Sequence, residues 1–72
     1  MKSKDIAVVR STLEKIAVDT TGRDWSHFDS LDMVDFVMDV EDYYGIELDG
    51  LEDKKLTFDE FVAYVHREIG GE

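Results

Sequence analysis

The chain has 72 residues, enough for one domain with a small core but too few to enclose a deep catalytic pocket as well. It contains no cysteine, which excludes disulfides, Cys-based metal sites and thiol nucleophiles supplied by the protein itself. The net charge of −10 argues against binding to nucleic acid or anionic lipid and favours partners with basic surfaces.

The first predicted helix runs from Ser3 to Asp19. Its apolar residues follow the spacing of one buried helix face: Ile6, Val9, Leu13 and Ile16. Thr20, Thr21 and Gly22 are expected to stop this helix, because glycine readily adopts the left-handed conformation that ends helices. Residues 20–29 then form a loop, in which Trp25 and Phe28 are the expected apolar anchors.

The second predicted helix runs from Ser30 to Tyr44 and lies in the most acidic part of the chain. From Asp24 to Asp53 there are eleven Asp or Glu residues and no Lys or Arg. Asp29 is a good N-cap, an acidic residue in the first turn suits the positive helix end, and Gly45 ends the helix.

Placed at about 100° per residue, this second helix has three distinct faces. A core face is predicted for Met33, Phe36, Val37, Val40 and Tyr44. A separate, narrow apolar strip consists of Leu31, Val34 and Met38. Carboxylates border the strip on both sides: Asp32, Asp35, Asp39 and Asp42 on one, Glu41 on the other. The strip is expected either to contact other helices of the bundle or, in our preferred interpretation, to dock partner proteins.

The remainder of the chain predicts a connector and a last helix. Residues 46–48 form a short extended segment that can bury Ile46 or Leu48, and residues 49–55 can form one short helical turn. The last helix begins with a capping box between Thr57 and Glu60, and Leu56 fits a hydrophobic staple before it. Its core stripe is Phe58, Phe61, Val62, Val65 and Ile69, and it ends at Gly70-Gly71.

These elements predict an all-α fold, a small bundle of three long helices plus one short helix, in a single domain over residues 1–72. No apolar run is long enough to span a membrane. The N-terminus also lacks the apolar core of a signal peptide. We therefore expect a monomeric, cytoplasmic protein without membrane insertion.

Asp29-Ser30-Leu31-Asp32, followed by Val34, Met38, Glu41 and Tyr44, resembles the Asp-Ser-Leu motif and recognition helix of acyl carrier proteins. The resemblance extends through residues 45–48 into 55–58 and 64–65, and covers roughly Asp29 to Val65. Three motif residues alone recur by chance. The motif, acidic helix, short connector and Thr-capped final helix together are much more specific.

The resemblance implies a carrier, not an enzyme, with 4′-phosphopantetheine from coenzyme A attached covalently to Ser30 beside Asp29. The cofactor's thiol would hold acyl groups as thioesters. Implied partners are a phosphopantetheinyl transferase and acyl-handling enzymes of the ketosynthase, acyltransferase or ligase type, acting in fatty acid, lipid or polyketide-type biosynthesis. The implied docking residues are Leu31, Asp32, Val34, Asp35, Met38, Asp39, Glu41 and Asp42. The implied wall of an acyl cavity is Phe36, Val37 and Val40.

Two features depart from the family pattern. His27 stands where the family usually has glycine, three residues before the serine, and the preceding loop is several residues shorter. Both departures indicate a specialised carrier rather than the housekeeping carrier of fatty acid synthesis. The Asp preceding Ser30 and the strongly acidic helix favour an acyl carrier over a peptidyl carrier.

Other functions fit less well. A cofactor-free acidic interaction module would use the same strip without needing Ser30. An EF-hand-like calcium loop over Asp49–Glu60 lacks the usual acid at its third position and the glycine at its sixth. A hydrolase built from Ser30, His27 and Asp29 has no visible oxyanion pocket. The two histidines are too isolated to predict a metal site.

Overall fold

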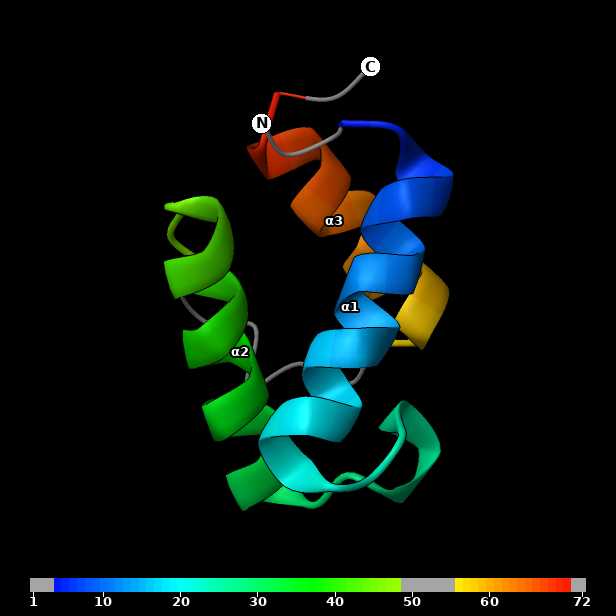
Figure 1. Ribbon diagram of the computed structural model, residues 1–72, viewed down its shortest axis with the longest axis vertical. Coiled ribbons are helices and arrows are strands. Elements are labelled where there is room, and N and C mark those ends of the chain that lie inside the picture. Colours follow the sequence, from blue (N-terminus) through cyan, green and yellow to red (C-terminus); the bar gives the residue numbers. More distant parts are fainter. Residues whose placement is uncertain (1–3, 49–55, 71–72) are drawn as a thin grey trace.

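The computed structural model describes residues 4–48 and 56–70, and every regular element in these ranges is helical. The elements are α1 (Ile6–Thr21), the 3-10 turn η1 (Trp25–His27), α2 (Ser30–Tyr44) and α3 (Phe58–Glu68). Helix α1 packs against both α2 and α3 (Figure 1). The predicted all-α bundle is confirmed, whereas the predicted short helical turn over 49–55 lies outside the described residues.

Helix α1 begins and ends later than the predicted Ser3–Asp19. The Asp5 side chain caps it by accepting a hydrogen bond from the Ala7 amide at 2.9 Å, so the first helical residue is Ile6. At the other end the Thr21 hydroxyl donates a hydrogen bond to the Ala17 carbonyl at 2.8 Å. This bond holds Thr21 in the last turn of the helix. Gly22 then ends the helix with φ 72°, as predicted.

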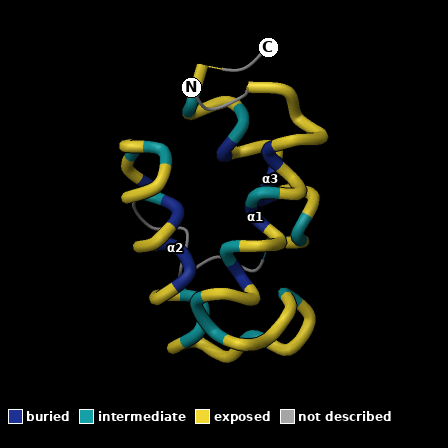
Figure 2. The backbone as a smooth tube through the Cα atoms, viewed as in Figure 1, coloured by how far each residue is buried: buried dark blue, intermediate teal, exposed yellow. Residues whose placement is uncertain are grey.

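Among the described residues, ten are buried and form the core, and all ten are apolar (Figure 2). They are Val9, Leu13 and Ala17 of α1, Phe36, Val37 and Val40 of α2, Leu48, and Phe61, Val62 and Val65 of α3. The predicted core faces of α2 and α3 are confirmed, with Met33, Tyr44, Phe58 and Ile69 packed at the edge. Ile6 was wrongly predicted as a core residue. It is half exposed because it borders an open groove shared with Asp59 and Val62 of α3.

Trp25 anchors the loop between α1 and α2 in an aromatic cluster. Its ring centroid lies 5.3–6.0 Å from those of four phenylalanines: Phe28, Phe36, Phe58 and Phe61. The tilted and edge-to-face geometries are those that aromatic pairs favour. The predicted anchoring roles of Trp25 and Phe28 are thereby confirmed, and the loop before α2 is held against both α2 and α3.

The connector after α2 is held by Glu41. Gly45 leaves the helix with φ 68°, and its amide donates to the Glu41 carbonyl at 2.7 Å. The Glu41 side chain accepts from the Leu48 amide, also at 2.7 Å. Leu48 is fully buried, so of the two predicted anchors it is the one that enters the core, while Ile46 packs at the edge.

Helix α3 begins with the predicted capping box. The Glu60 amide donates to the Thr57 hydroxyl at 3.1 Å, and the Thr57 amide donates to the Glu60 carboxylate at 2.8 Å. Arg10 of α1 pairs with Asp59, and its guanidinium lies 5.2 Å from the centre of the Phe58 ring. The first turn of α3 is therefore fixed by its own cap and by a cation from α1.

Candidate functional site

Ser30 is the first residue of α2 and is exposed. The predicted cap at Asp29 is present: its carboxylate accepts from the Asp32 amide at 2.8 Å. Asp32 completes a capping box by accepting from the Asp29 amide at 3.3 Å. Within the described part of the chain the Ser30 hydroxyl has no hydrogen-bond partner. Because Asp29 caps the Asp32 amide, the Ser30 hydroxyl is not needed as the helix cap, and Ser30 stays exposed.

Arg23 is a residue of this site that the sequence reasoning missed. Its Nη1 lies 3.2 Å from the Asp32 carboxylate and 3.9 Å from that of Asp29. It therefore bridges the two acids on either side of Ser30, and the Asp32 side chain is only 17% exposed. Its position in the sequence could have indicated this role, because Arg23 is the last basic residue before the acidic stretch that begins at Asp24.

The loop before Ser30 contains a small hydrogen-bonded cluster in η1. His27 Nδ1 lies 2.7 Å from the Asp24 carboxylate, and the Ser26 hydroxyl donates to the same oxygen at 2.7 Å. His27 thus pairs with Asp24 in the described structure and forms no hydrogen bond with Ser30. This arrangement does not supply the nucleophile–base contact that a serine hydrolase needs.

The hydrogen bond from His27, and secondarily that from Ser26, lowers the pKa of Asp24 below its ordinary 3.8. A depressed folded-state pKa means that this carboxylate stabilises the fold fully above the ordinary value and loses its contribution as the pH falls through the lower one. We expect Asp24→Asn to melt slightly below the wild type near neutral pH, with the difference vanishing in acid. Thermal melts across an acid pH series measure this. An offset that stays constant down to the lowest pH would contradict the assignment, and His27→Gln serves as the variant that removes only the larger cause.

The apolar strip of α2 faces solvent. Leu31, Val34 and Met38 are 75%, 40% and 57% exposed. Among the described residues this exposure favours the docking interpretation over packing against other helices of the bundle, and we call these three residues the docking strip. An exposed contiguous apolar strip on so charged a helix is a feature of interaction surfaces.

The carboxylates around the docking strip differ in how freely they are presented. Asp35, Asp39 and Asp42 are exposed, and Asp39 accepts a hydrogen bond from the Thr20 hydroxyl of α1. Asp32 and Glu41 are partly buried and already bonded, to Arg23 and to the Leu48 amide respectively. The face that α2 offers to a basic partner is thus dominated by the three exposed aspartates.

A curated relative, the acyl carrier protein of Thermotoga maritima, is 40% identical to this chain over 43 residues. The chain resembles acyl carrier proteins. The match covers 58% of the chain and 53% of the relative, so it spans about half the length of that protein. No family model matches the chain. No solved structure matches it either.

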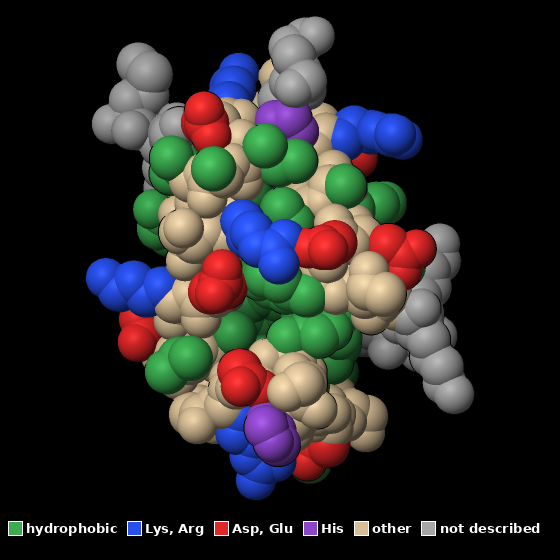
Figure 3. Space-filling model, turned by 90° about the vertical axis from the view of Figure 1, so that its right-hand side faces the viewer, with side chains coloured by type: hydrophobic (Ala, Val, Ile, Leu, Met, Phe, Trp, Pro, Cys, Tyr) green, Lys and Arg blue, Asp and Glu red, His purple; other side chains and the backbone are tan. Residues whose placement is uncertain are grey.

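The residues expected to wall an acyl cavity in such a carrier, Phe36, Val37 and Val40, are packed inside the core at 0%, 4% and 0% exposure. A pocket of about 320 Å³ lies elsewhere, between α1, η1 and the first residue of α3, on the face of the molecule that Figure 3 shows. None of these three residues lines it. The described residues contain no cluster of three or more metal-binding side chains. None of the described helices is both long and apolar enough to cross a membrane. The calcium-loop alternative falls largely on residues 49–55, outside the described ranges.

The cap at Asp29 can be tested directly. Asp29→Ala removes the acceptor for the Asp32 amide and is expected to cost about 1 kcal/mol of unfolding free energy. The Ser30 hydroxyl then becomes a competing acceptor for the uncapped amides and should be less accessible as a free hydroxyl. Asp29→Asn retains a capping oxygen and should be close to wild type in stability. Chemical denaturation measures the stability of both variants, and an unfolding free energy of Asp29→Ala equal to that of the wild type would count against this role of the cap.

Proposed function

We propose that this protein is a carrier that holds acyl groups as thioesters on a 4′-phosphopantetheine arm attached to Ser30. The observation that carries the proposal is the exposed Ser30 hydroxyl at the start of α2, which has no hydrogen-bond partner among residues 4–48 and 56–70 and lies directly beside the docking strip. The resemblance to an acyl carrier protein supports it. The chain itself has no thiol, and the arm supplies the sulfur on which thioester chemistry depends.

The start of α2 suits a phosphodiester on Ser30. The first turn of a helix presents free amides and the positive end of the helix dipole, which together favour a phosphate group. Asp29 and Asp32 oppose a further negative charge there, and Arg23, bridging both carboxylates, offsets that repulsion. The chain's own residues therefore provide an accessible oxygen and a balanced charge around it.

Attachment needs only that the chain present this oxygen to a transferase. The serine oxygen forms a bond to the pantetheine-bearing phosphorus of coenzyme A, the pyrophosphate P–O bond breaks, and adenosine 3′,5′-bisphosphate leaves. The serine proton passes to a base of the transferase. In this proposal the protein is the substrate of that reaction and the carrier in later ones, and is not itself an enzyme.

The proposed partners are the transferase and acyl-handling enzymes of the ketosynthase, acyltransferase or ligase type. Their basic surfaces would meet the exposed carboxylates of Asp35, Asp39 and Asp42, which raises association rates. The docking strip would supply the buried apolar contacts on which affinity depends. Asp32 and Glu41 remain proposed docking residues, although each is already bonded within the chain.

The loop before Ser30 favours a specialised carrier within fatty acid, lipid or polyketide-type biosynthesis. His27 pairs with Asp24 and so shapes this loop with a side-chain contact that glycine cannot make. A partner approaching Ser30 would meet the exposed imidazole next to the motif.

The test is covalent loading. The purified protein is incubated with coenzyme A, Mg²⁺ and a broad-specificity transferase, and its intact mass is compared with that of Ser30→Ala. Ser11→Ala, which removes an exposed serine of α1, is the matched control. We expect wild type and Ser11→Ala each to gain one phosphopantetheine and Ser30→Ala to gain none. A folded wild type that gains no mass with several transferases would favour the cofactor-free interaction module instead.

A further inference from the structure

Arg23 has hydrogen-bonding capacity beside Ser30 that the two acids of the capping box leave unused. Its contacts with Asp29 and Asp32 both run through Nη1, at 3.9 Å and 3.2 Å. A guanidinium carries further N–H donors in a planar fork, and in the described segments of the chain Nε and Nη2 of Arg23 have no hydrogen-bond partner. The Arg23 side chain is also 54% exposed, so another acceptor can reach these donors.

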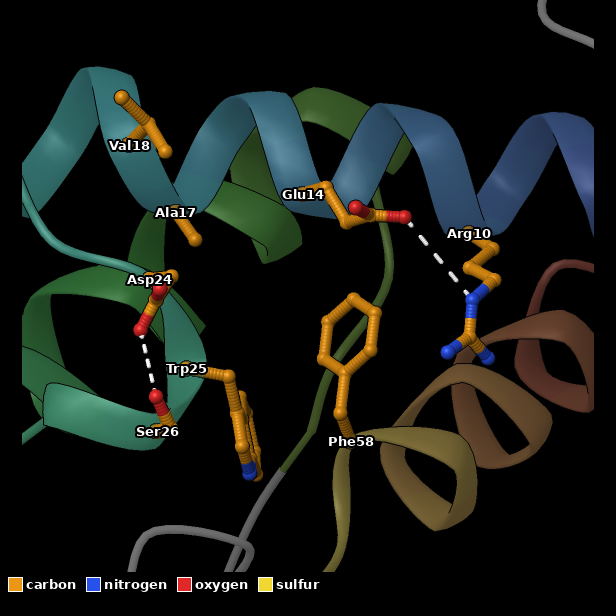
Figure 4. Close-up of a pocket in the computed structure, with 8 residues that line it drawn as sticks. All are labelled: Arg10, Glu14, Ala17, Val18, Asp24, Trp25, Ser26 and Phe58. Atoms are coloured by element: carbon orange, nitrogen blue, oxygen red, sulfur yellow. Dashed lines mark hydrogen bonds and ion pairs between the residues drawn. The ribbon is translucent and has the colours of Figure 1, made fainter.

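The loop that carries Arg23 is anchored on both sides of this residue. The Thr21 hydroxyl accepts a hydrogen bond from the Arg23 amide at 3.0 Å. Two residues further along the chain, Trp25 points into the pocket beside η1, where its ring lies next to Phe58 with 5.5 Å between the centroids (Figure 4). The backbone at Arg23 is therefore held near the start of α2, in the position from which the guanidinium meets both acids.

Arg23 is the strong base nearest to Ser30 in the sequence. From Asp24 to Asp53 there is no Lys or Arg, and the His27 imidazole is already bonded to the Asp24 carboxylate at 2.7 Å. The phosphorus of an attached arm is bonded directly to the serine oxygen, so its negative charge would enter the most acidic part of the chain. A guanidinium fork matches the oxygens of a phosphate as well as those of a carboxylate. Arg23 can therefore serve both kinds of acceptor at once.

We propose that Arg23 binds the phosphodiester of the arm on Ser30 through its unused donors while Nη1 keeps its contact with Asp32; the inference rests on the proposed carrier function. The guanidinium then joins the phosphate to the capping box and holds the root of the arm against the first turn of α2. The added negative charge is paired where it arises, so attachment of the arm does not destabilise this acidic helix.

The experiment compares the melting temperature of each protein before and after attachment of the arm, with intact mass reporting attachment separately. At low salt, where charge contacts are least screened, we expect the melting temperature of the wild type to stay the same or rise on attachment. That of Arg23→Gln should fall by about 4 °C, the shift expected from one unpaired charge in a domain of this size. Because the two forms of the same variant are compared, the loss of the Asp32 contact itself cancels.

Arg67→Gln is the matched control, because it removes the same charge from an exposed residue of α3. The end of α3 lies at the opposite end of the bundle from the start of α2 (Figure 1). This control should behave as the wild type does. Arg23→Lys should recover part of the fall, because an ammonium keeps the charge but lacks the fork. Equal falls for Arg23→Gln and Arg67→Gln, or no recovery with Arg23→Lys, would overturn the assignment.

Nuclear magnetic resonance of the ¹⁵N-labelled wild type tests the contact without any substitution. On attachment of the arm, the guanidinium N–H signals of Arg23 should shift and exchange more slowly with water, while those of Arg67 stay unchanged. The ³¹P signal of the arm should in turn differ between the wild type and Arg23→Gln. Unchanged Arg23 signals in a loaded protein would overturn the contact and leave the carrier function intact. A wild type that never receives the arm overturns both.

Discussion

Replacing Phe36 with alanine is expected to abolish the cooperative unfolding transition of this protein. Phe36 is fully buried, and its ring centroid lies 5.2 Å from that of Phe61, 5.3 Å from Phe28 and 6.0 Å from Trp25. Truncating such a residue costs about 3–5 kcal/mol. A single core at this chain length supplies a net stability of only about 3–5 kcal/mol, so one truncation consumes most of it.

Far-UV circular dichroism during heating measures this effect. Phe58→Ala is the matched control, because Phe58 belongs to the same aromatic cluster but is only partly buried. It should lower the melting temperature and leave a cooperative transition. If the two variants melted alike, the fully buried Phe36 would contribute no more to stability than Phe58 at the edge of the same cluster.

The local elements of the site were predictable because their determinants lie within a few residues. Asp29 caps α2 and Thr57 caps α3 through contacts three residues away, and both caps are present as expected. The three faces of α2 likewise follow from helical period alone, which is why the exposure of Leu31 and the burial of Phe36 were both predicted. These features can be predicted from sequence because they do not depend on the position of any segment distant in the chain.

The features that sequence reasoning missed depend on how separate segments meet. The contact of Arg23 with Asp32 needs the path of the loop, and that loop is itself placed by Trp25 packing on Phe58 and Phe61. The same packing creates the pocket beside η1, which no periodicity indicates. Ile6 was predicted to be buried and is instead half exposed. Its spacing fits the core face of α1, but the α3 surface opposite it forms an open groove.

Leu31→Ala is expected to reduce kcat/KM for arm attachment by about tenfold or more while leaving stability within about 0.5 kcal/mol of the wild type. Leu31 is 75% exposed, so it contributes little to the fold and has its apolar surface available to a partner. Ile6→Ala is the matched control, since it truncates an isomeric side chain that is 50% exposed on α1, away from Ser30. The control should leave kcat/KM unchanged.

The salt dependence of the same reaction separates apolar docking from electrostatic steering. Loss of Leu31 should reduce kcat/KM by a similar factor at low and high salt, because it removes an apolar contact and no charge. The exposed carboxylates act at longer range, and their contribution is screened over roughly 10 Å at 0.1 M salt. Equal losses for Leu31→Ala and Ile6→Ala would contradict the docking strip. A loss confined to Leu31→Ala and insensitive to salt would place an apolar contact with the transferase one residue from Ser30, the proposed site of attachment.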